Sequence, residues 1–298
     1  MNKIIVIVGP TAVGKTKLSI ELAKKFNGEI INADSTQIFR GLDIATAKVT
    51  EEERENVVHH LLDIKDVTED YTVYDYQLDG RKCIEDILSR GKTPIIVGGT
   101  GLYIKALLCD YKFEDENKVS NNYDIYTNEQ LYDKLLSVDP NTKIHKNNRK
   151  RVERSLNYYE KNGEPLSAKE KTDKEIYDAI YIGLTTDRDT LYERINKRVE
   201  IMIDNGLLDE AKQVFDSNIR TKAILTPIGY KELFPYFEKQ ESLESCLEKI
   251  KQNSRRYAKR QYTWFNNQME ICWFNVDFEN FNNTVQAIST YIDSSEKM

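Results

Sequence analysis

Apolar residues gather along the chain in short runs separated by longer amphipathic segments. Four of these runs, Ile4–Val8, 29–33, Thr93–Val97 and 179–184, predict buried parallel strands. Segments with helical periodicity lie between the first three runs, one after Thr16 and one over about residues 74–90. Strands that alternate with helices predict an α/β fold built on a parallel sheet flanked by helices.

This alternation stops between about residues 111 and 178. A polar, Asn-rich stretch at 114–122 comes first, and two helical patterns follow. One begins with Asn128 as its expected N-cap, and the other carries Val152 and Leu156 on its apolar face and ends at Gly163. We therefore expect the first part of an α/β core over residues 1–111, an all-helical insertion domain over 112–178 and the second part of the core over 179–298.

Helical periodicity returns after the fourth strand pattern. A long helix is expected to start near Asp187 with Leu191, Ile195 and Val199 facing inward. A basic helix follows over about residues 243–264. Residues 271–276 predict a late strand, and residues 281–292 predict a final helix.

The first strand pattern leads directly into a phosphate-loop motif. Its residues match G-x-x-x-x-G-K-[ST]: Gly9, Pro10, Thr11, Ala12, Val13, Gly14, Lys15 and Thr16. The backbone N–H groups of such a loop and the following helix N-terminus attract phosphate. Lys15 would supply a cation to the outer phosphates, and the Thr16 hydroxyl can ligate Mg²⁺. We therefore expect a P-loop NTPase-like core that binds a di- or triphosphate.

Composition narrows the class of protein further. The 298 residues are 40% hydrophobic, and no apolar run approaches the roughly 20 residues that span a membrane. The first strand starts at Lys3, which leaves no room for a signal peptide. The four cysteines form no C-x-x-C pair, so neither a zinc site nor a disulfide framework is indicated. We expect a cytoplasmic protein without a membrane partner.

The net charge of −6 by itself argues against nucleic acid, but the basic residues are clustered. Residues 249–260 hold six Lys and Arg side chains and no acidic one, and residues 143–154 hold six against the single Glu153. Either segment alone is typical of a solvated helix face. Two such segments on an acidic chain make RNA binding as plausible as that simpler explanation.

Two strand ends carry further candidate chemistry. Asp34 follows the second strand pattern, at the sheet edge where α/β proteins bind ligands. Its carboxylate could act as a general base, hold Mg²⁺ through water, or only shape a turn. The third pattern ends in Gly98-Gly99-Thr100-Gly101 and lacks the Walker-B Asp of a typical P-loop NTPase. This argues against an ordinary ATPase and suits a loop that holds a leaving group.

Arg194 and Arg198 lie four residues apart, on one face of the helix that starts near Asp187. They could close over a bound diphosphate and neutralise its charge. Because Glu193 and Glu200 are close in sequence, a surface ion-pair role is the simpler interpretation from spacing alone.

Together these segments resemble one family, the tRNA dimethylallyltransferases, also called tRNA isopentenyltransferases. The resemblance extends over nearly the whole chain. It is carried by Gly9–Thr16, Asp34–Gln37, Asp43–Lys48, His59–Asp63, Gly98–Tyr103, Leu191–Val199, Ile228–Glu232 and Arg255–Trp264. No zinc finger follows these motifs, as one does in eukaryotic members, so we expect a bacterial-type member.

The resemblance implies transfer of a dimethylallyl group from dimethylallyl diphosphate to N6 of adenosine 37, beside the anticodon of a tRNA. It implies catalytic roles for Thr11, Lys15, Asp34 and Arg198, with Asp34 as the base. The phosphate loop and Arg194 would bind the diphosphate, and Thr16 would ligate Mg²⁺. The tRNA contacts would come from Asp34, Ser35, Thr36, Gln37, Thr100, Arg149, Lys150, Arg151, Arg154, Arg255, Arg256, Lys259 and Arg260. A monomer is the default expectation.

Three alternatives stay open at this point. An adenylate isopentenyltransferase would prenylate free AMP, ADP or ATP, but it has no use for the insertion or the basic helix. A small-molecule kinase commonly owns such a phosphate loop, although Gly98–Gly101 argues against it. A non-catalytic, GTPase-like RNA-binding module would need an N-K-x-D-type base-reading segment, and the sequence shows none.

Overall fold

The structure, a computed structural model, describes residues 3–111, 113, 123–168 and 174–295. The chain forms two compact units, a core unit of residues 1–110 and 175–298 and an insertion unit of residues 111–174. Cys109 and Glu175 form an antiparallel bridge, and the Ile176 N–H donates to the Leu108 carbonyl over 2.9 Å. Since the chain leaves and re-enters the core unit at neighbouring points, the insertion interrupts the sequence of the core without interrupting its sheet.

The core unit is built on a six-stranded parallel sheet with the strand order β3-β2-β4-β1-β5-β6. The strands are β1 (Ile4–Val8), β2 (Gly28–Asn32), β3 (His59–His60), β4 (Thr93–Val97), β5 (Ala179–Thr185) and β6 (Cys272–Asn275). The expected parallel α/β sheet is therefore confirmed. The short edge strand β3 was not expected. Its two residues are too few to show a period-two pattern, and they are recognised as a strand only by their pairing with β2 in the folded chain.

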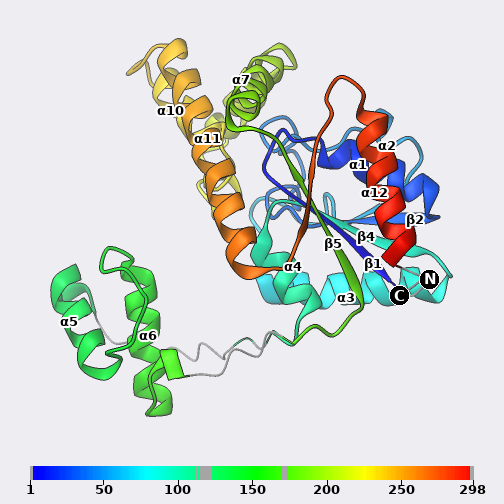
Figure 1. The fold of residues 1–298 in the computed structure, drawn as a ribbon. Helices are drawn as coiled ribbons and strands as arrows, with labels where there is room; N and C mark the ends of the chain where they lie inside the picture. The colour runs from blue at the N-terminus through cyan, green and yellow to red at the C-terminus, as the bar shows by residue number, and fades with distance from the viewer. Residues whose placement is uncertain (1–2, 112, 114–122, 169–173, 296–298) are drawn as a thin grey trace. The chain divides into compact units, whose positions relative to one another are not determined.

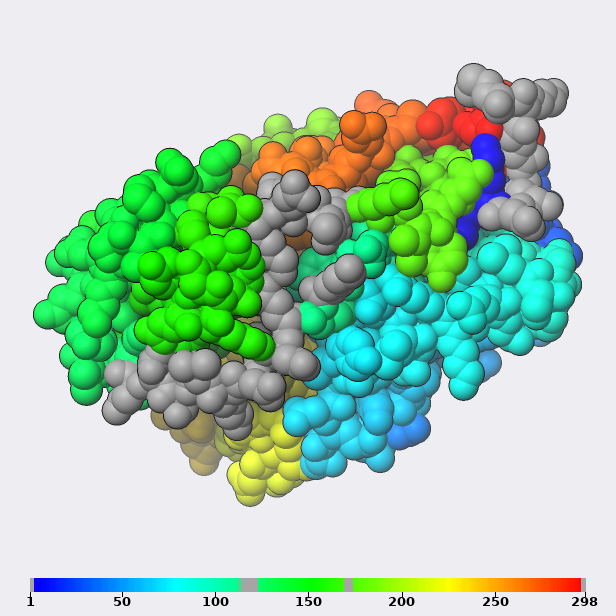
Figure 2. All heavy atoms as spheres, turned by 90° about the horizontal axis from the view of Figure 1, so that it is seen from below, coloured from blue at the N-terminus to red at the C-terminus, as the bar shows by residue number. Residues whose placement is uncertain are grey.

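Both faces of the sheet are covered, which explains why the strands are continuously apolar. Ile4 and Val6 of β1 pack into one hydrophobic cluster with α3 (Val73–Ser89) and α4 (Gly101–Leu108). Ile5 and Ile7 point to the opposite face and pack with α1 (Lys15–Lys25) and α12 (Phe281–Ser295). Figure 1 shows α12 beside α1 on one face of the sheet and α3 with α4 on the other. The outer side of α3, cyan in Figure 2, forms a broad part of the surface turned to the viewer.

A helical layer follows β5 in the core unit (Figure 1). It consists of α7 (Arg188–Asp204), α8 (Leu207–Asp216), α9 (Lys222–Leu225), α10 (Tyr230–Phe237) and α11 (Leu243–Gln268), and the short α2 (Glu51–Arg54) lies earlier in the chain. Asp187 caps α7 by accepting a hydrogen bond from the Thr190 N–H, as the sequence suggested. The sequence did not predict α8, α9 and α10, which are 10, 4 and 8 residues long. Pro235 lies inside α10.

The insertion unit has its own small core. Its elements are the 3₁₀ turn η1 (Tyr123–Ile125), α5 (Asn128–Val138), α6 (Arg149–Asn162) and the 3₁₀ turn η2 (Leu166–Ala168). Leu131 and Leu135 pack against Val152 and Leu156 between the two helices. Asn128 is not the N-cap of α5. Thr127 caps that helix in a capping box with Gln130.

Two further observations concern the insertion and the chain as a whole. Gly163 ends α6 with a left-handed φ of +71°, as expected from the sequence. The Asn-rich stretch 114–122 lies outside the residues that the structure describes. Within the described parts of the chain, no helix combines the length and apolarity needed to cross a membrane.

Candidate active site

The phosphate loop joins β1 to α1, at the carboxyl edge of the sheet. Gly9 adopts a φ of +142°, and a Cβ there would come within 2.6 Å of the Leu184 carbonyl oxygen on β5. Only glycine fits this position without moving a strand. Gly14 is the N-cap of α1, so the helix begins at Lys15 and its first N–H groups point into the loop.

Lys15 lies inside this loop, where its Nζ donates to the Pro10 carbonyl over 2.7 Å. Burial, and to a smaller extent the nearby Arg198, lower the pKa of Lys15 from 10.5 to about 7, although Asp34 opposes the shift. An anionic ligand stabilises a desolvated ammonium of this kind more than it stabilises an ammonium that is already paired with a carboxylate. The loop is therefore arranged to receive negative charge.

Arg194 and Arg198 both reach the phosphate loop from α7. The Nε of Arg194 donates to the Ala12 carbonyl over 3.0 Å, and its guanidinium lies 3.8 Å from the centre of the Phe278 ring. The Arg198 guanidinium donates to the Thr11 hydroxyl over 3.1 Å, and burial lowers the pKa of Arg198. The structure thus brings both arginines to the site, whereas sequence spacing alone favoured a surface ion-pair role for them.

Asp34 stands directly after β2, beside the loop. Its Oδ1 accepts from the Thr36 N–H over 3.0 Å and from the Thr36 hydroxyl over 2.7 Å, so it does shape a turn. Its carboxylate is also close enough to Lys15 and Arg198 to oppose part of the lowering of their pKa values by burial. Asn32 fixes the backbone on either side by accepting from the Asp34 N–H and donating to the Asp34 carbonyl, each over 3.1 Å.

Thr100 connects the end of β4 to the turn that contains Asp34. Its hydroxyl accepts from the Ser35 N–H over 3.1 Å and donates to the Ser35 hydroxyl over 3.3 Å. The Tyr257 hydroxyl is hydrogen-bonded to the Thr100 and Gln261 side chains, and burial raises the pKa of Tyr257 above its ordinary range. Polar side chains that follow β2 and β4 therefore meet side chains of α11 at one edge of the sheet.

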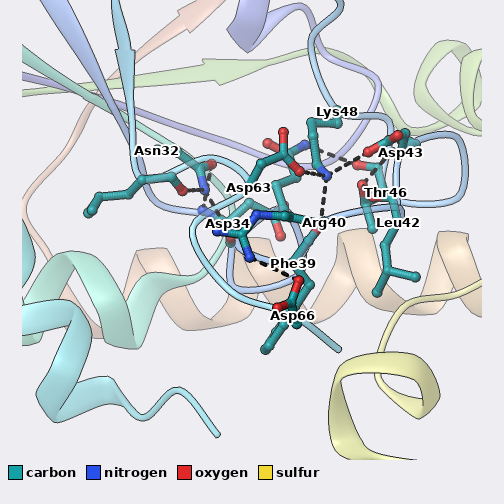
Figure 3. A network of polar contacts seen from close by, with 12 residues as sticks. Asn32, Asp34, Phe39, Arg40, Leu42, Asp43, Thr46, Lys48, Asp63 and Asp66 are labelled. Atoms are coloured by element: carbon teal, nitrogen blue, oxygen red, sulfur yellow. Dashed lines mark hydrogen bonds and ion pairs between the residues drawn. The ribbon is translucent and has the colours of Figure 1, made fainter. Parts of the chain in front are cut away.

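The loop after Asp34 is held from within by a buried cation. The Lys48 ammonium contacts Asp43 over 2.6 Å, Asp63 over 2.5 Å and the Phe39 carbonyl over 2.8 Å (Figure 3). The Gln37 amide donates to the carbonyls of Thr46 and Ala47 and crosses the same loop. The segments 43–48 and 59–63, far apart in sequence, are thus parts of one structure that supports the Asp34 turn.

A carboxylate from the helical layer holds the same loop from outside. Glu210 accepts from the backbone N–H groups of Asp43, Ile44 and Ala45 at 2.8 to 3.1 Å, and from the Tyr230 hydroxyl over 2.7 Å. No local sequence pattern marks Glu210, because its three backbone partners are 165 to 167 residues away.

The four basic residues between positions 255 and 260 of α11 divide into two groups. Arg255 is partly buried, donates to the Asn196 side chain over 2.5 Å and lies near the Tyr192 ring. Arg256, Lys259 and Arg260 are exposed. Within the part of the chain that the structure describes, no helix or strand covers these three side chains, so they can contact a polyanion.

The insertion unit shows a similar division. The Arg149 guanidinium donates to the carbonyls of Tyr123 and Tyr126 and pairs with Glu153 over 2.7 Å, so it stabilises the junction of η1 and α6. Lys150, Arg151 and Arg154 are exposed on α6. The sequence alone did not distinguish Arg149 from these neighbours.

Gln261 is a further site residue, and in the sequence it stands out only as part of the motif Arg255–Trp264. Its Oε1 accepts from the Thr11 N–H over 3.0 Å, and its Nε2 donates to the Gly99 carbonyl over 3.2 Å. Gln261 therefore joins the phosphate loop to the turn after β4.

This arrangement can bind a diphosphate beside a carboxylate and a set of polar side chains, and comparison with known proteins agrees. The protein-family model "IPP transferase" matches residues 37–268. A tRNA dimethylallyltransferase of Anoxybacillus flavithermus is 47% identical, over 98% of this chain and 96% of that protein.

Solved structures show the same likeness. The tRNA isopentenylpyrophosphate transferase of Bacillus halodurans is 42% identical with a TM-score of 0.77, covering 99% of this chain and 96% of that one. A eukaryotic dimethylallyltransferase described as acting on tRNA is 32% identical with a TM-score of 0.85, covering 99% of this chain and 80% of that one.

Proposed function

This chain belongs to the tRNA dimethylallyltransferase family, and from that premise we propose how its residues transfer a dimethylallyl group from dimethylallyl diphosphate to N6 of adenosine 37 of tRNA. One observation carries the assignment of roles. The Thr11 hydroxyl, Lys15 and Arg198 converge on the phosphate loop, and Asp34 lies within electrostatic reach of the two cations. A leaving diphosphate and a base are thereby held side by side.

The phosphate loop binds the diphosphate of the donor. Apart from Pro10, which has no N–H, and Thr11, whose N–H donates to Gln261, the residues of the loop offer backbone N–H groups, and Lys15 adds a positive charge. Arg194 and Arg198 close over the loop from α7 and neutralise the charge that develops on the departing diphosphate. The Thr11 hydroxyl accepts from Arg198, so its own proton would be available to an oxygen of the bound donor.

Mg²⁺ fits the donor set of this site. Among the described residues no three His, Cys, Asp or Glu side chains gather into a metal cluster, and the Thr16 hydroxyl stands at the start of α1. Mg²⁺ accepts such a site, because it keeps several waters and binds through one or two protein ligands plus substrate phosphates. When bound, it would neutralise diphosphate charge. Thr16 would hold it there.

Asp34 serves as the base for the acceptor. N6 of adenine is a weak nucleophile because its lone pair is delocalised into the ring. In the transfer, the N6 lone pair forms a bond to C1 of the dimethylallyl group, the C1–O bond breaks, and the bond electrons leave with the diphosphate. The N6 proton passes to the Asp34 carboxylate, whose Oδ1 is already fixed by Thr36.

The acceptor nucleotide would be unstacked from the anticodon loop before it reaches this site. Ser35, Thr36, Gln37 and Thr100 would surround it, since they lie with Asp34 at the same sheet edge. The exposed basic side chains of α11, Arg256, Lys259 and Arg260, and those of α6, Lys150, Arg151 and Arg154, would contact the phosphates of the anticodon arm. Arg149 and Arg255 would support them from partly buried positions.

The test of the function uses purified protein, Mg²⁺ and radiolabelled dimethylallyl diphosphate, with unmodified tRNA containing A36-A37-A38 and free AMP offered in parallel. We expect label in tRNA only, and none when adenosine 37 is replaced by guanosine. Label in AMP alone would place the protein among adenylate isopentenyltransferases, and ATP turnover without label would indicate a kinase or ATPase. Size-exclusion chromatography with light scattering tests the proposed monomer in the same preparation.

A further inference from the structure

One side chain of α11 connects the two halves of the site. The Gln261 amide accepts from the Thr11 N–H over 3.0 Å and donates to the Gly99 carbonyl over 3.2 Å, and only 5% of its surface is exposed. Thr11 belongs to the donor-binding loop after β1, and Gly99 belongs to the turn after β4. Below this bridge the backbones of the two strands are joined directly, since the Gly98 N–H donates to the Ile7 carbonyl over 3.3 Å.

The chemistry of this connection requires an amide. Thr11 presents a backbone donor and Gly99 presents a backbone acceptor, so the bridging side chain must offer one acceptor and one donor in a fixed plane. These partners also fix which end of the amide is oxygen. A buried Gln that makes both hydrogen bonds favours one distance between the loop and the turn. If either of them moved, the Thr11 N–H or the Gly99 carbonyl would lose its hydrogen bond.

The turn after β4 is shaped to admit this side chain. A Cβ at Gly99 would lie 2.0 Å from Gln261 Nε2, so only glycine leaves room for the amide. The Tyr257 hydroxyl, one helical turn earlier on α11, is hydrogen-bonded to both Gln261 and Thr100. Tyr257 and Gln261 therefore span from the Thr11 backbone to the Thr100 hydroxyl, which in turn holds Ser35 beside Asp34.

We propose that Gln261 is a positioning residue that sets the distance between the donor-binding phosphate loop and the acceptor-binding edge formed by Thr100 and the Asp34 turn. The inference rests on the proposed function, because it assigns donor and acceptor to these two halves. Gln261 would not touch either substrate. It would act through Thr11, whose hydroxyl contacts Arg198, and through the turn that carries Thr100.

The phosphate loop and the turn after β4 each keep other hydrogen bonds when the bridge is removed, those of Lys15 to Pro10 and of Ser35 to Thr100. Losing the bridge should therefore affect the reaction more than either binding step. Gln261→Met keeps the volume of the side chain and removes both hydrogen bonds. We expect kcat for tRNA prenylation to fall about 10- to 100-fold, since small misplacements of reacting groups cost rates of this order. The KM for dimethylallyl diphosphate and the KM for tRNA should each change less than about 3-fold.

Gln77→Met provides a matched control. Gln77 is also 5% exposed, also lies on a helix, and its amide donates to the Ala106 carbonyl over 2.7 Å, away from the site. Both variants lose a buried amide that bonds to backbone, so both should lower Tm by a similar amount. Only the Gln261 variant should lose kcat.

Gln261→Glu tests the hydrogen-bond pattern itself. An ionised Glu keeps the acceptor for Thr11 but places an oxygen against the Gly99 carbonyl, whereas a protonated Glu restores the donor. The ratio of its kcat to that of the wild type should therefore rise as the pH falls from 8 to 6. A side chain that only fills space would leave this ratio constant.

The outcomes separate this inference from the function on which it rests. Absence of prenyl transfer by the wild type would overturn both. Transfer by the wild type, with Gln261→Met no slower than Gln77→Met, would overturn the positioning role alone. So would a Gln261→Met loss that appears only as a raised KM for one substrate, because that result would make Gln261 part of a single binding site.

Discussion

Replacing Lys15 by Met should stabilise the ligand-free core unit while it abolishes donor binding. The Lys15 ammonium lies in the phosphate loop beside Arg198, and burial and this like charge lower its pKa from 10.5 to about 7. For a lysine, a pKa that is lower in the folded than in the unfolded state means that the charged ammonium destabilises the folded state. Met keeps the length of the side chain and removes the charge.

The magnitude follows from the pKa. A fall from 10.5 to about 7 corresponds to a penalty of about 5 kcal/mol at low pH. Lys15 is only partly buried, so water screens the charge and we expect about half of this penalty. Loss of the hydrogen bond to the Pro10 carbonyl offsets about 1 kcal/mol. The net gain for Lys15→Met should be about 1 kcal/mol near pH 6.5.

The gain should depend on pH in a defined direction. The folded pKa of Lys15 is depressed, so the penalty is fully present below about pH 7 and disappears as the pH approaches the unfolded value of 10.5. Wild-type stability should therefore rise relative to the variant between pH 6.5 and pH 9. We expect the two proteins to be about equally stable at pH 9.

Urea unfolding followed by tryptophan fluorescence measures this difference. Both tryptophans, Trp264 and Trp273, lie in the core unit, so the signal reports the unit that contains Lys15. Inorganic diphosphate with Mg²⁺ should stabilise the wild type and leave the variant unchanged. A variant less stable than the wild type at pH 6.5, or a difference that does not vary with pH, would refute the reasoning.

Three further predictions address the acceptor side and the supporting network. Asp34→Asn keeps the turn but removes the base, so kcat should fall about 10²- to 10⁴-fold with little change in either KM; near-normal turnover would exclude Asp34 as base. Glu210→Gln weakens the hold on the N–H groups of residues 43–45 and should cost the core unit about 1–2 kcal/mol in urea unfolding, and no measurable loss would contradict this. Lys259→Gln combined with Arg260→Gln should raise the KM for tRNA and flatten its dependence on salt, whereas an unchanged slope would show that neither contacts phosphate.

The sequence by itself determined the elements whose signal is local. The apolar run Ile4–Val8 predicted β1, because a strand buried on both faces must be apolar throughout. The motif Gly9–Thr16 predicted the phosphate loop, because its glycines and its Lys act through their own short segment. The order of such motifs along the chain was sufficient to indicate the family.

Only the tertiary structure decided which polar side chains meet. Arg194 and Arg198 looked like surface ion-pair residues, and packing of α7 brings them onto Ala12 and Thr11 instead. Arg149 looked like its exposed neighbours, and the fold of the insertion unit ties it to backbone carbonyls.

Tertiary packing also explains why no sequence pattern marked Gln261 as a residue of the site. Gln261 lies 250 residues from Thr11 and 162 from Gly99, and it connects them only because α11 packs across both strand ends. A hydrogen bond between distant segments leaves no periodicity in either segment. The sequence therefore specified the chemistry of each strand end, and the tertiary structure specified which side chains meet there.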